Sequence, residues 1–130
     1  MYTVKEIATK LHITEHTVRF YSDQGLIPPV KRDKNNNRIF DDACLNWFIG
    51  VKHLRDSGMS IEAIKEYVNL CLEGDQTIKR RYEILKRQKE IAEIDFEEAR
   101  LRLDYMTKKL DHYQDIINKT IEDDMNMANW

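Results

Sequence analysis

Residues that interrupt helices are scarce in this sequence, which has only four glycines and two prolines among its 130 residues. None of them lies after Gly74, so a long uninterrupted helix is possible in the second half of the chain. Gly-rich or Pro-rich low-complexity linkers are also excluded. We therefore predict a mainly α fold in one small domain with a helical extension.

Long hydrophobic runs and metal-ligand clusters are missing as well. No apolar run approaches the roughly 18 residues of a membrane helix, and the start of the chain lacks the apolar core of a signal peptide. The two cysteines, Cys44 and Cys71, form no CxxC pair and no His/Cys cluster at zinc-ligand spacing. These absences predict a cytoplasmic protein with no membrane association, no metal and no cofactor.

Groupings typical of an enzyme are absent too. The four histidines are scattered, there is no glycine-rich phosphate loop, and no Ser, Cys, His and Asp grouping has a catalytic context. We predict no enzymatic activity.

Charge is unevenly distributed along the sequence, around a formal net value of −2. Residues 1–40 contain seven Lys or Arg and four acidic residues, whereas residues 71–130 contain eleven basic and fourteen acidic ones.

Two short helices are predicted within the basic head. Thr3 and Glu6 form a capping box before a helix over Val4–Leu11. Thr14 offers a second N-cap, for a helix over Glu15–Asp23. Two helices joined by about three residues predict a helix-turn-helix, whose second helix is placed to enter a DNA groove.

The second helix carries side chains that suit DNA contact. Those near its start can reach base edges or phosphates, and a tyrosine further on can donate its hydroxyl to phosphate; they are Glu15, His16, Thr17, Arg19 and Tyr21. Any amphipathic helix can hold an Arg and a Tyr, so these residues alone do not decide for DNA.

A polar run, KRDKNNNRIF, follows at residues 31–40. Its composition favours a solvated loop, but consecutive Asn residues tolerate positive φ in tight turns. Apolar residues at both ends can anchor it, with Phe40 packed into the head. We therefore predict a β-hairpin over Val30–Phe40, the wing of a winged helix-turn-helix. Its basic residues suit phosphate or minor-groove contacts: Lys31, Arg32, Lys34 and Arg38.

Two further helices are predicted after the wing, ending at Gly58 and Gly74. The second half of the chain that follows them is dominated by a heptad pattern. Steps of four and three residues from Ile78 reach twelve positions, and eleven are apolar or aromatic, with Lys89 the exception. Such a repeat indicates a coiled coil, and its simplest partner is a second copy in a C2 dimer. The predicted dimerisation residues are Ile78, Tyr82, Leu85, Ala92, Phe96, Ala99, Leu103, Met106, Leu110 and Tyr113.

The stretch TVKEIATKLHITEHTVRFYSDQGLIPPVKRDKNNNRIFDD, followed by VKHLRDSGMSIEAIKEY, resembles the MerR family of bacterial transcription regulators. The order TVRFY, GLIPP, a basic turn and RIF carries the resemblance, and EGDQTIKRRYEIL is similar to that family's dimerisation helix. The resemblance implies a winged helix-turn-helix DNA-binding domain over residues 1–74. It also implies an antiparallel dimerisation coiled coil over 75–118, leaving a tail over 119–130.

The same resemblance implies a homodimer on a pseudo-palindromic promoter operator. Bending and untwisting of the DNA would let RNA polymerase engage badly spaced promoter elements. The residues that it assigns to DNA are Thr14, His16, Thr17, Arg19 and Tyr21 on the second helix, Arg32, Asn35 and Arg38 on the wing, and Lys52 or Arg55 as a weaker backbone contact.

Inducer chemistry is not fixed by the resemblance. The chain is most similar in length to the aldehyde- and thiol-stress members, several of which have a Cys where this chain has His53. Metal-sensing members of the family have cysteines near the start of the long helix and in a loop after it. This chain has no cysteine from Leu72 onward, so the sequence predicts no metal sensing of that type. A small-molecule or electrophile inducer stays open, although inert buried cysteines are the simpler interpretation of Cys44 and Cys71. The alternative function is a coiled-coil protein-interaction module without sequence-specific DNA binding.

Overall fold

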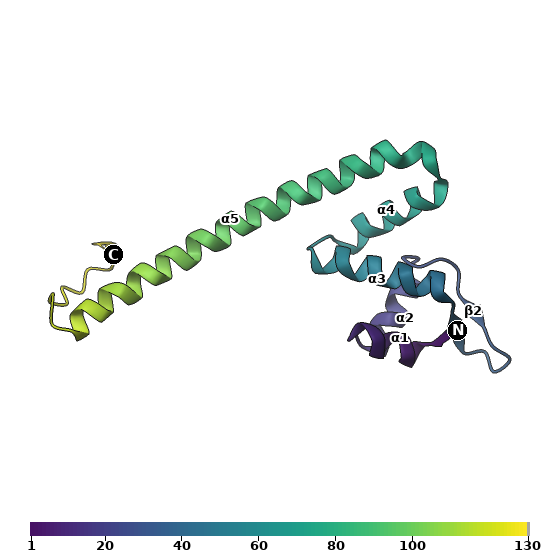
Figure 1. The fold of residues 1–130 in the computed structure, drawn as a ribbon, viewed down its shortest axis with the longest axis horizontal. Helices are drawn as coiled ribbons and strands as arrows, with labels where there is room; N and C mark the ends of the chain where they lie inside the picture. Colours follow the sequence, from purple (N-terminus) through teal and green to yellow (C-terminus); the bar gives the residue numbers. More distant parts are fainter. Residues whose placement is uncertain (130) are drawn as a thin grey trace. The chain divides into compact units, whose positions relative to one another are not determined.

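The computed structural model describes residues 1–129, which fall into two compact units, Met1–Gln88 and Lys89–Trp130. The first unit holds most of the secondary structure (Figure 1). Its elements are β1 (Tyr2–Thr3), α1 (Val4–Leu11), α2 (Glu15–Asp23), β2 (Lys31–Arg32), β3 (Arg38–Phe40), α3 (Asp42–Asp56), α4 (Ile61–Glu73), the 3-10 turn η1 (Asp75–Thr77) and the first turns of α5 (Ile78–Ile117). The predicted bounds of α1 and α2 are confirmed.

Side-chain caps decide where the helices of the head begin. The backbone N–H of Glu6 donates to Thr3 Oγ1 at 3.1 Å, and the Glu6 carboxylate accepts from the Thr3 N–H at 3.2 Å, so the predicted capping box is complete. Ser60 caps α4, its hydroxyl oxygen accepting from the Ala63 N–H at 3.1 Å. The cap of α3 is Asp41, whose carboxylate accepts from the Cys44 N–H at 2.8 Å.

A three-stranded antiparallel sheet with the order β1-β3-β2 contains the wing. The β2–β3 hairpin confirms the predicted one, whereas β1, with only two residues, was not predicted. The Asn residues do not set the turn by themselves. The Asp33 carboxylate accepts from the backbone N–H groups of Asn35 and Asn37, both at 2.9 Å, while Asn36 takes a φ of 62°.

The core of the first unit joins the helix-turn-helix to the sheet and to α3. Phe40 is fully buried, as predicted, and its ring meets that of Phe48 edge-on with 5.1 Å between centroids. Ile7 of α1 and Val18 of α2 belong to the same buried cluster, and so does Met59, which follows α3. Burying one such side chain contributes roughly 1.5–3 kcal/mol to folding, so the wing and α2 are anchored to one core.

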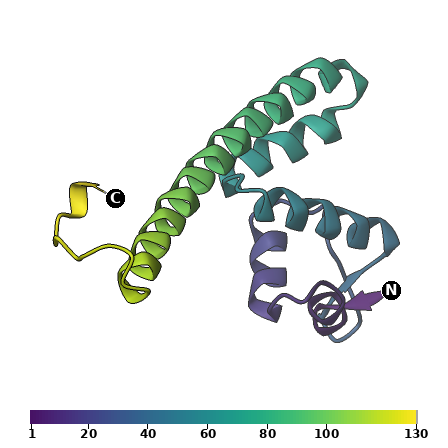
Figure 2. The same ribbon diagram turned by 60° about the vertical axis from the view of Figure 1, so that its left-hand side comes forward.

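The second unit has a different character, because it holds the rest of α5 followed by a short 3-10 turn, η2 (Met127–Asn129). Helix α5 runs as one continuous ribbon (Figure 2), and none of its residues is buried. Phe96 is 72 % exposed and Leu103 68 % exposed, and all ten predicted dimerisation residues are exposed. Among the described residues, no helix is long and apolar enough to span a bilayer.

Candidate nucleic-acid interface

The N-terminal end of α2 is organised by two threonines. Thr14 Oγ1 accepts from the Thr17 N–H at 3.0 Å, and the two hydroxyls lie 2.8 Å apart. Thr14 therefore caps the helix in addition to any contact that it makes outside the protein. The Thr17 N–H is thereby satisfied within the protein, and the positive end of the α2 dipole favours anions nearby.

Exposed side chains follow on the same helix. His16 is exposed, and so is Arg19, whose Nη2 lies 3.5 Å from Glu15 Oε1. Both members of this pair are about half exposed, and ion pairs of this kind contribute little to stability. Arg19 can exchange Glu15 for another anion at small cost. The structure thus leaves its guanidinium free to reorient.

Tyr21 has a packing role that the sequence did not indicate. The residue is only 7 % exposed, and its ring lies in the core beside Val18. Its neighbour Phe20 is more exposed, with the two ring centroids 6.2 Å apart. The aromatic ring of Tyr21 therefore holds α2 against the rest of the head, whatever its hydroxyl contacts.

Arg38 connects the wing to α2. Its Nη2 lies 2.8 Å from Asp23 Oδ1, and its Nη1 donates to the backbone carbonyl of Arg19 at 3.1 Å. The side chain is only 16 % exposed. One ion pair and one hydrogen bond from a charged donor thus join Arg38 to α2, so Arg38 is a strut between β3 and the end of α2. The sequence resemblance assigned Arg38 to DNA, and this internal role was not predicted.

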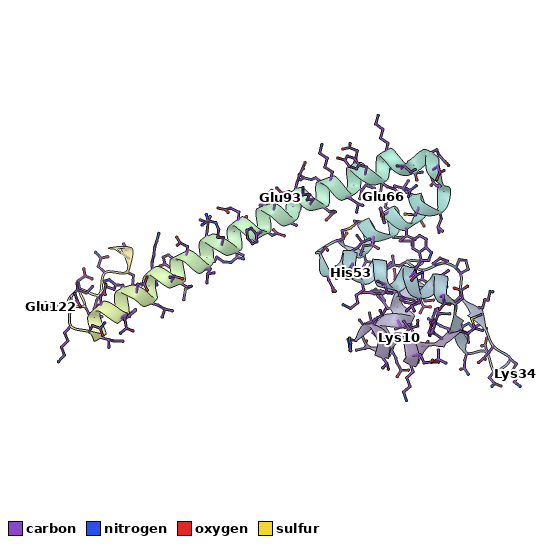
Figure 3. All side chains as sticks on the ribbon, viewed as in Figure 1. Lys10, Lys34, His53, Glu66, Glu93 and Glu122 are labelled. Carbon is purple, nitrogen blue, oxygen red and sulfur yellow. The ribbon has the colours of Figure 1, made fainter. Side chains whose placement is uncertain are left out.

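Three other wing side chains, Arg32, Lys34 and Asn35, are exposed. Arg32 is exposed and donates through Nη1 to the Asn36 carbonyl at 3.1 Å. Lys34 and Asn35 are exposed at the turn, and Lys34 lies at the outer end of the hairpin (Figure 3). The ordered Asp33 turn presents these three side chains from a defined backbone.

A cleft of about 430 Å³ lies between the first turn of α1, α2 and the wing. It brings together the predicted residues Arg19, Arg32 and Arg38 and adds Lys5, which sequence analysis missed. Four cationic side chains line it against two acidic ones, and it is lined by Thr3, Val4, Lys5, Glu15, Arg19, Arg32, Asp33, Asn36, Asn37 and Arg38. Lys5 lies in the first turn of α1, two residues after the end of β1, which pairs with β3 of the wing. Because β1 was not predicted, no sequence signal pointed to Lys5.

Lys52 and Arg55 are not part of this cleft. Lys52 Nζ pairs with Asp56 Oδ2 at 2.8 Å, and Arg55 Nη1 donates to the Met59 carbonyl at 2.9 Å, beyond the end of α3. Arg55 thereby satisfies a carbonyl next to the helix end. Both side chains lie on α3, away from the residues that line the cleft.

The two thiols lie in different surroundings. Cys44 is buried, and burial, followed by the nearby Asp41, raises the pKa of its thiol. Cys71 is half-buried and lines a second hollow, of about 540 Å³, between α3 and α4. The walls of that hollow are mostly apolar and include Trp47, Leu54 and Tyr67. The described residues contain no group of three or more side chains that could hold a metal ion.

Comparison with known proteins is consistent with this geometry. Residues 2–71 match the family described as MerR HTH family regulatory protein. The chain belongs to the MerR family. An HTH-type transcriptional regulator from Haemophilus influenzae, described as uncharacterised, is 35 % identical over 113 residues, which cover 87 % of this chain and 84 % of that protein.

Two further relatives of this MerR-family chain carry more specific descriptions. The HTH-type transcriptional regulator AdhR from Bacillus subtilis is 40 % identical over 82 residues, covering 63 % of this chain and 59 % of AdhR. A crystal structure of HiNmlR is described as a MerR family regulator lacking the sensor domain, bound to promoter DNA. It matches with a TM-score of 0.77 and 34 % identity, over 90 % of this chain and 93 % of that one. The predicted family and fold class are confirmed.

Proposed function

We propose that this MerR-family regulator binds double-stranded promoter DNA as a homodimer and thereby controls transcription. The cationic cleft between α2 and the wing carries the proposal, since it places Lys5, Arg19 and Arg32 beside the exposed end of a recognition helix. The likeness to HiNmlR, a regulator seen on promoter DNA, supports it. A protein-interaction module gives no reason for these cations to meet beside α2.

The proposed roles differ along the interface. His16 and Arg19 reach base edges in the major groove, and Thr14 and Thr17 contact the backbone at the start of α2. The wing residues Arg32, Lys34 and Asn35 contact phosphates or the minor groove. Further backbone contacts come from the cleft and from α3, through Lys5, the Tyr21 hydroxyl, Arg38, and Lys52 or Arg55.

Dimerisation follows from the exposed apolar stripe on α5. A helix with side chains such as Phe96 and Leu103 in water is stable in solution when a partner covers them. A second copy gives a two-fold dimer, and its two α2 helices would meet half-sites separated by about 34–36 Å or a multiple of this spacing. We further propose that the operator is pseudo-palindromic, that binding distorts it to the benefit of RNA polymerase, and that the protein acts in the cytoplasm.

Fluorescence anisotropy tests this function directly. The labelled duplex is the region upstream of the protein's own gene, and the control is a random duplex of equal length. We expect preference for the former by a factor of about 10³ or more, with an affinity that falls steeply as salt rises. Equal affinity for both duplexes at moderate salt would contradict sequence-specific regulation.

A further inference from the structure

The corner between α4 and α5 contains a compact polar cluster, which lies wholly within the unit Met1–Gln88. Helix α4 ends at Gly74, whose φ of 108° suits glycine, and η1 turns the chain into α5. Thr77, the last residue of η1, is only 6 % exposed and is a buried polar residue in this corner. Carbonyl groups at the end of a helix need partners, and this cluster provides them.

Thr77 ties the end of α4 to the start of α5. Its Oγ1 lies 2.6 Å from the Leu70 carbonyl oxygen and 2.8 Å from that of Gly74, so the single hydroxyl proton is shared between two carbonyls. The Thr77 N–H also donates to the Gly74 carbonyl, at 3.1 Å. A buried hydroxyl with these contacts resists any change in the corner, because movement would leave carbonyls unsatisfied.

Arg81, in the first turn of α5, completes the cluster. Its Nε donates to Thr77 Oγ1 at 3.0 Å, and its Nη2 donates to the Gly74 carbonyl at 3.2 Å. Its Nη1 lies 3.9 Å from Cys71 Sγ. The planar guanidinium thus contacts Cys71 in α4, Gly74 just after it and Thr77 in η1 at once, and a rigid fork of donors fixes direction as well as distance.

The neighbouring ion pair is a weaker link between the same two helices. Arg80 Nη2 lies 3.0 Å from Glu66 Oε1, but the two side chains are 68 % and 53 % exposed. Exposed pairs of this kind contribute little to stability and hold their geometry loosely. The direction in which α5 leaves α4 is therefore held mainly by polar contacts of the partly buried Thr77–Arg81 cluster, together with the packing of Ile84 against the core of the head.

We propose that Thr77 and Arg81 are positioning residues that determine the half-site spacing the dimer accepts. The inference rests on the proposed function. In a dimer joined through α5, each head is held at the α4–α5 corner, wherever the dimer axis crosses the helix. A tilt of about 10° at one end of a helix moves a point about 30 Å away by about 5 Å, more than the rise of one base pair.

The test uses full-length protein and duplexes that the unmodified protein selects from a random library. The half-site spacing of the selected duplex is then changed by one or two base pairs. The variants are Thr77→Val, which removes the hydroxyl, and Arg81→Met, which removes the donors. Lys79→Met is the matched control, since Lys79 is an exposed cation on the same turn. Circular dichroism and sedimentation check fold and dimerisation.

Unmodified protein and Lys79→Met are expected to prefer the selected spacing by about tenfold, the scale on which DNA deformation discriminates. For Thr77→Val and Arg81→Met we expect this preference to fall below about threefold, with unchanged affinity for a single half-site. Half-site affinity depends on the head alone, so a general structural defect would lower it.

Folded, dimeric variants that keep the full spacing preference would overturn this inference alone. Unfolding of both variants would also overturn it, because the cluster would then serve general stability rather than positioning. If the unmodified protein selects no sequence at all, the proposed function itself fails, and that outcome is seen before any variant is measured.

Discussion

The units Met1–Gln88 and Lys89–Trp130 differ in how far their apolar side chains are buried. The first buries Phe40, Phe48 and Ile7 completely within one core, whereas α5 leaves Phe96 and Leu103 largely in water. The head can therefore fold by its own contacts, while the long helix depends on another molecule. Stability of the head should be independent of protein concentration, and stability of the helix should rise with it.

Replacing Phe48 by Ala should have the largest effect on the head. Removing a fully buried aromatic ring costs about 3–5 kcal/mol, enough to unfold many small domains. Urea unfolding followed by tryptophan fluorescence measures the loss. Phe20→Ala is the control, since Phe20 is partly exposed. A similar loss for both variants would mean that Phe48 has no special place in the core.

Replacing Leu103 by Lys should act on the helix instead. A charge within the apolar seam is expected to weaken the dimer by about a hundredfold, because pairing would bury it. Analytical ultracentrifugation measures the monomer–dimer equilibrium. Arg102→Lys, a neighbouring change that keeps the charge, should leave it unaltered. A Leu103→Lys protein that dimerises normally would remove α5 as the dimerisation surface.

Two arginines of the interface should separate stability from binding. Arg38→Ala is expected to lower the free energy of unfolding by about 1–2 kcal/mol, since it removes an ion pair and a charge-assisted hydrogen bond, and to weaken DNA binding as the wing loosens. Arg19→Ala should weaken binding by about 1–3 kcal/mol with unchanged stability. Paired chemical denaturation and anisotropy measure both quantities. Equal stability of the two variants would contradict the strut.

The smallest expected effect is a difference in alkylation rate between the two cysteines, with Cys71 reacting about tenfold faster than Cys44. Thiols react as thiolates, and burial raises the pKa of Cys44, so less of its thiolate is present at neutral pH. Mass spectrometry after brief exposure to iodoacetamide should find Cys71 modified first, with Cys44 catching up as the pH rises. Denatured protein, in which both thiols are exposed, is the control. Faster modification of Cys44 in the folded protein would contradict its buried placement.

Features that depend on neighbours in sequence were predictable. The caps at Thr3 and Ser60 and the heptad of α5 follow from spacing alone, because a helix brings residues three and four apart together. The basic character of the wing was equally visible. For these elements local chemistry and final structure agree.

Features that depend on distant neighbours were not predictable. The Arg38 strut needs a carboxylate from α2 and a backbone carbonyl that only the folded head brings to β3. For Tyr21 the sequence predicted a phosphate contact through the hydroxyl, and the burial of its ring becomes visible only once α2 is packed against the head. Strand β1 is two residues long and has no periodicity, so only its pairing with β3 reveals it.

The Asp33 turn has a consequence for the kinetics of recognition. Two backbone N–H groups held by one carboxylate mean that the wing is ordered before any ligand arrives. The conformational entropy of ordering these residues, about 1–2 kcal/mol for each, is then lost during folding and not at the encounter. Association should accordingly proceed without a slow ordering phase, at a rate limited by diffusion and by the attraction of opposite charges.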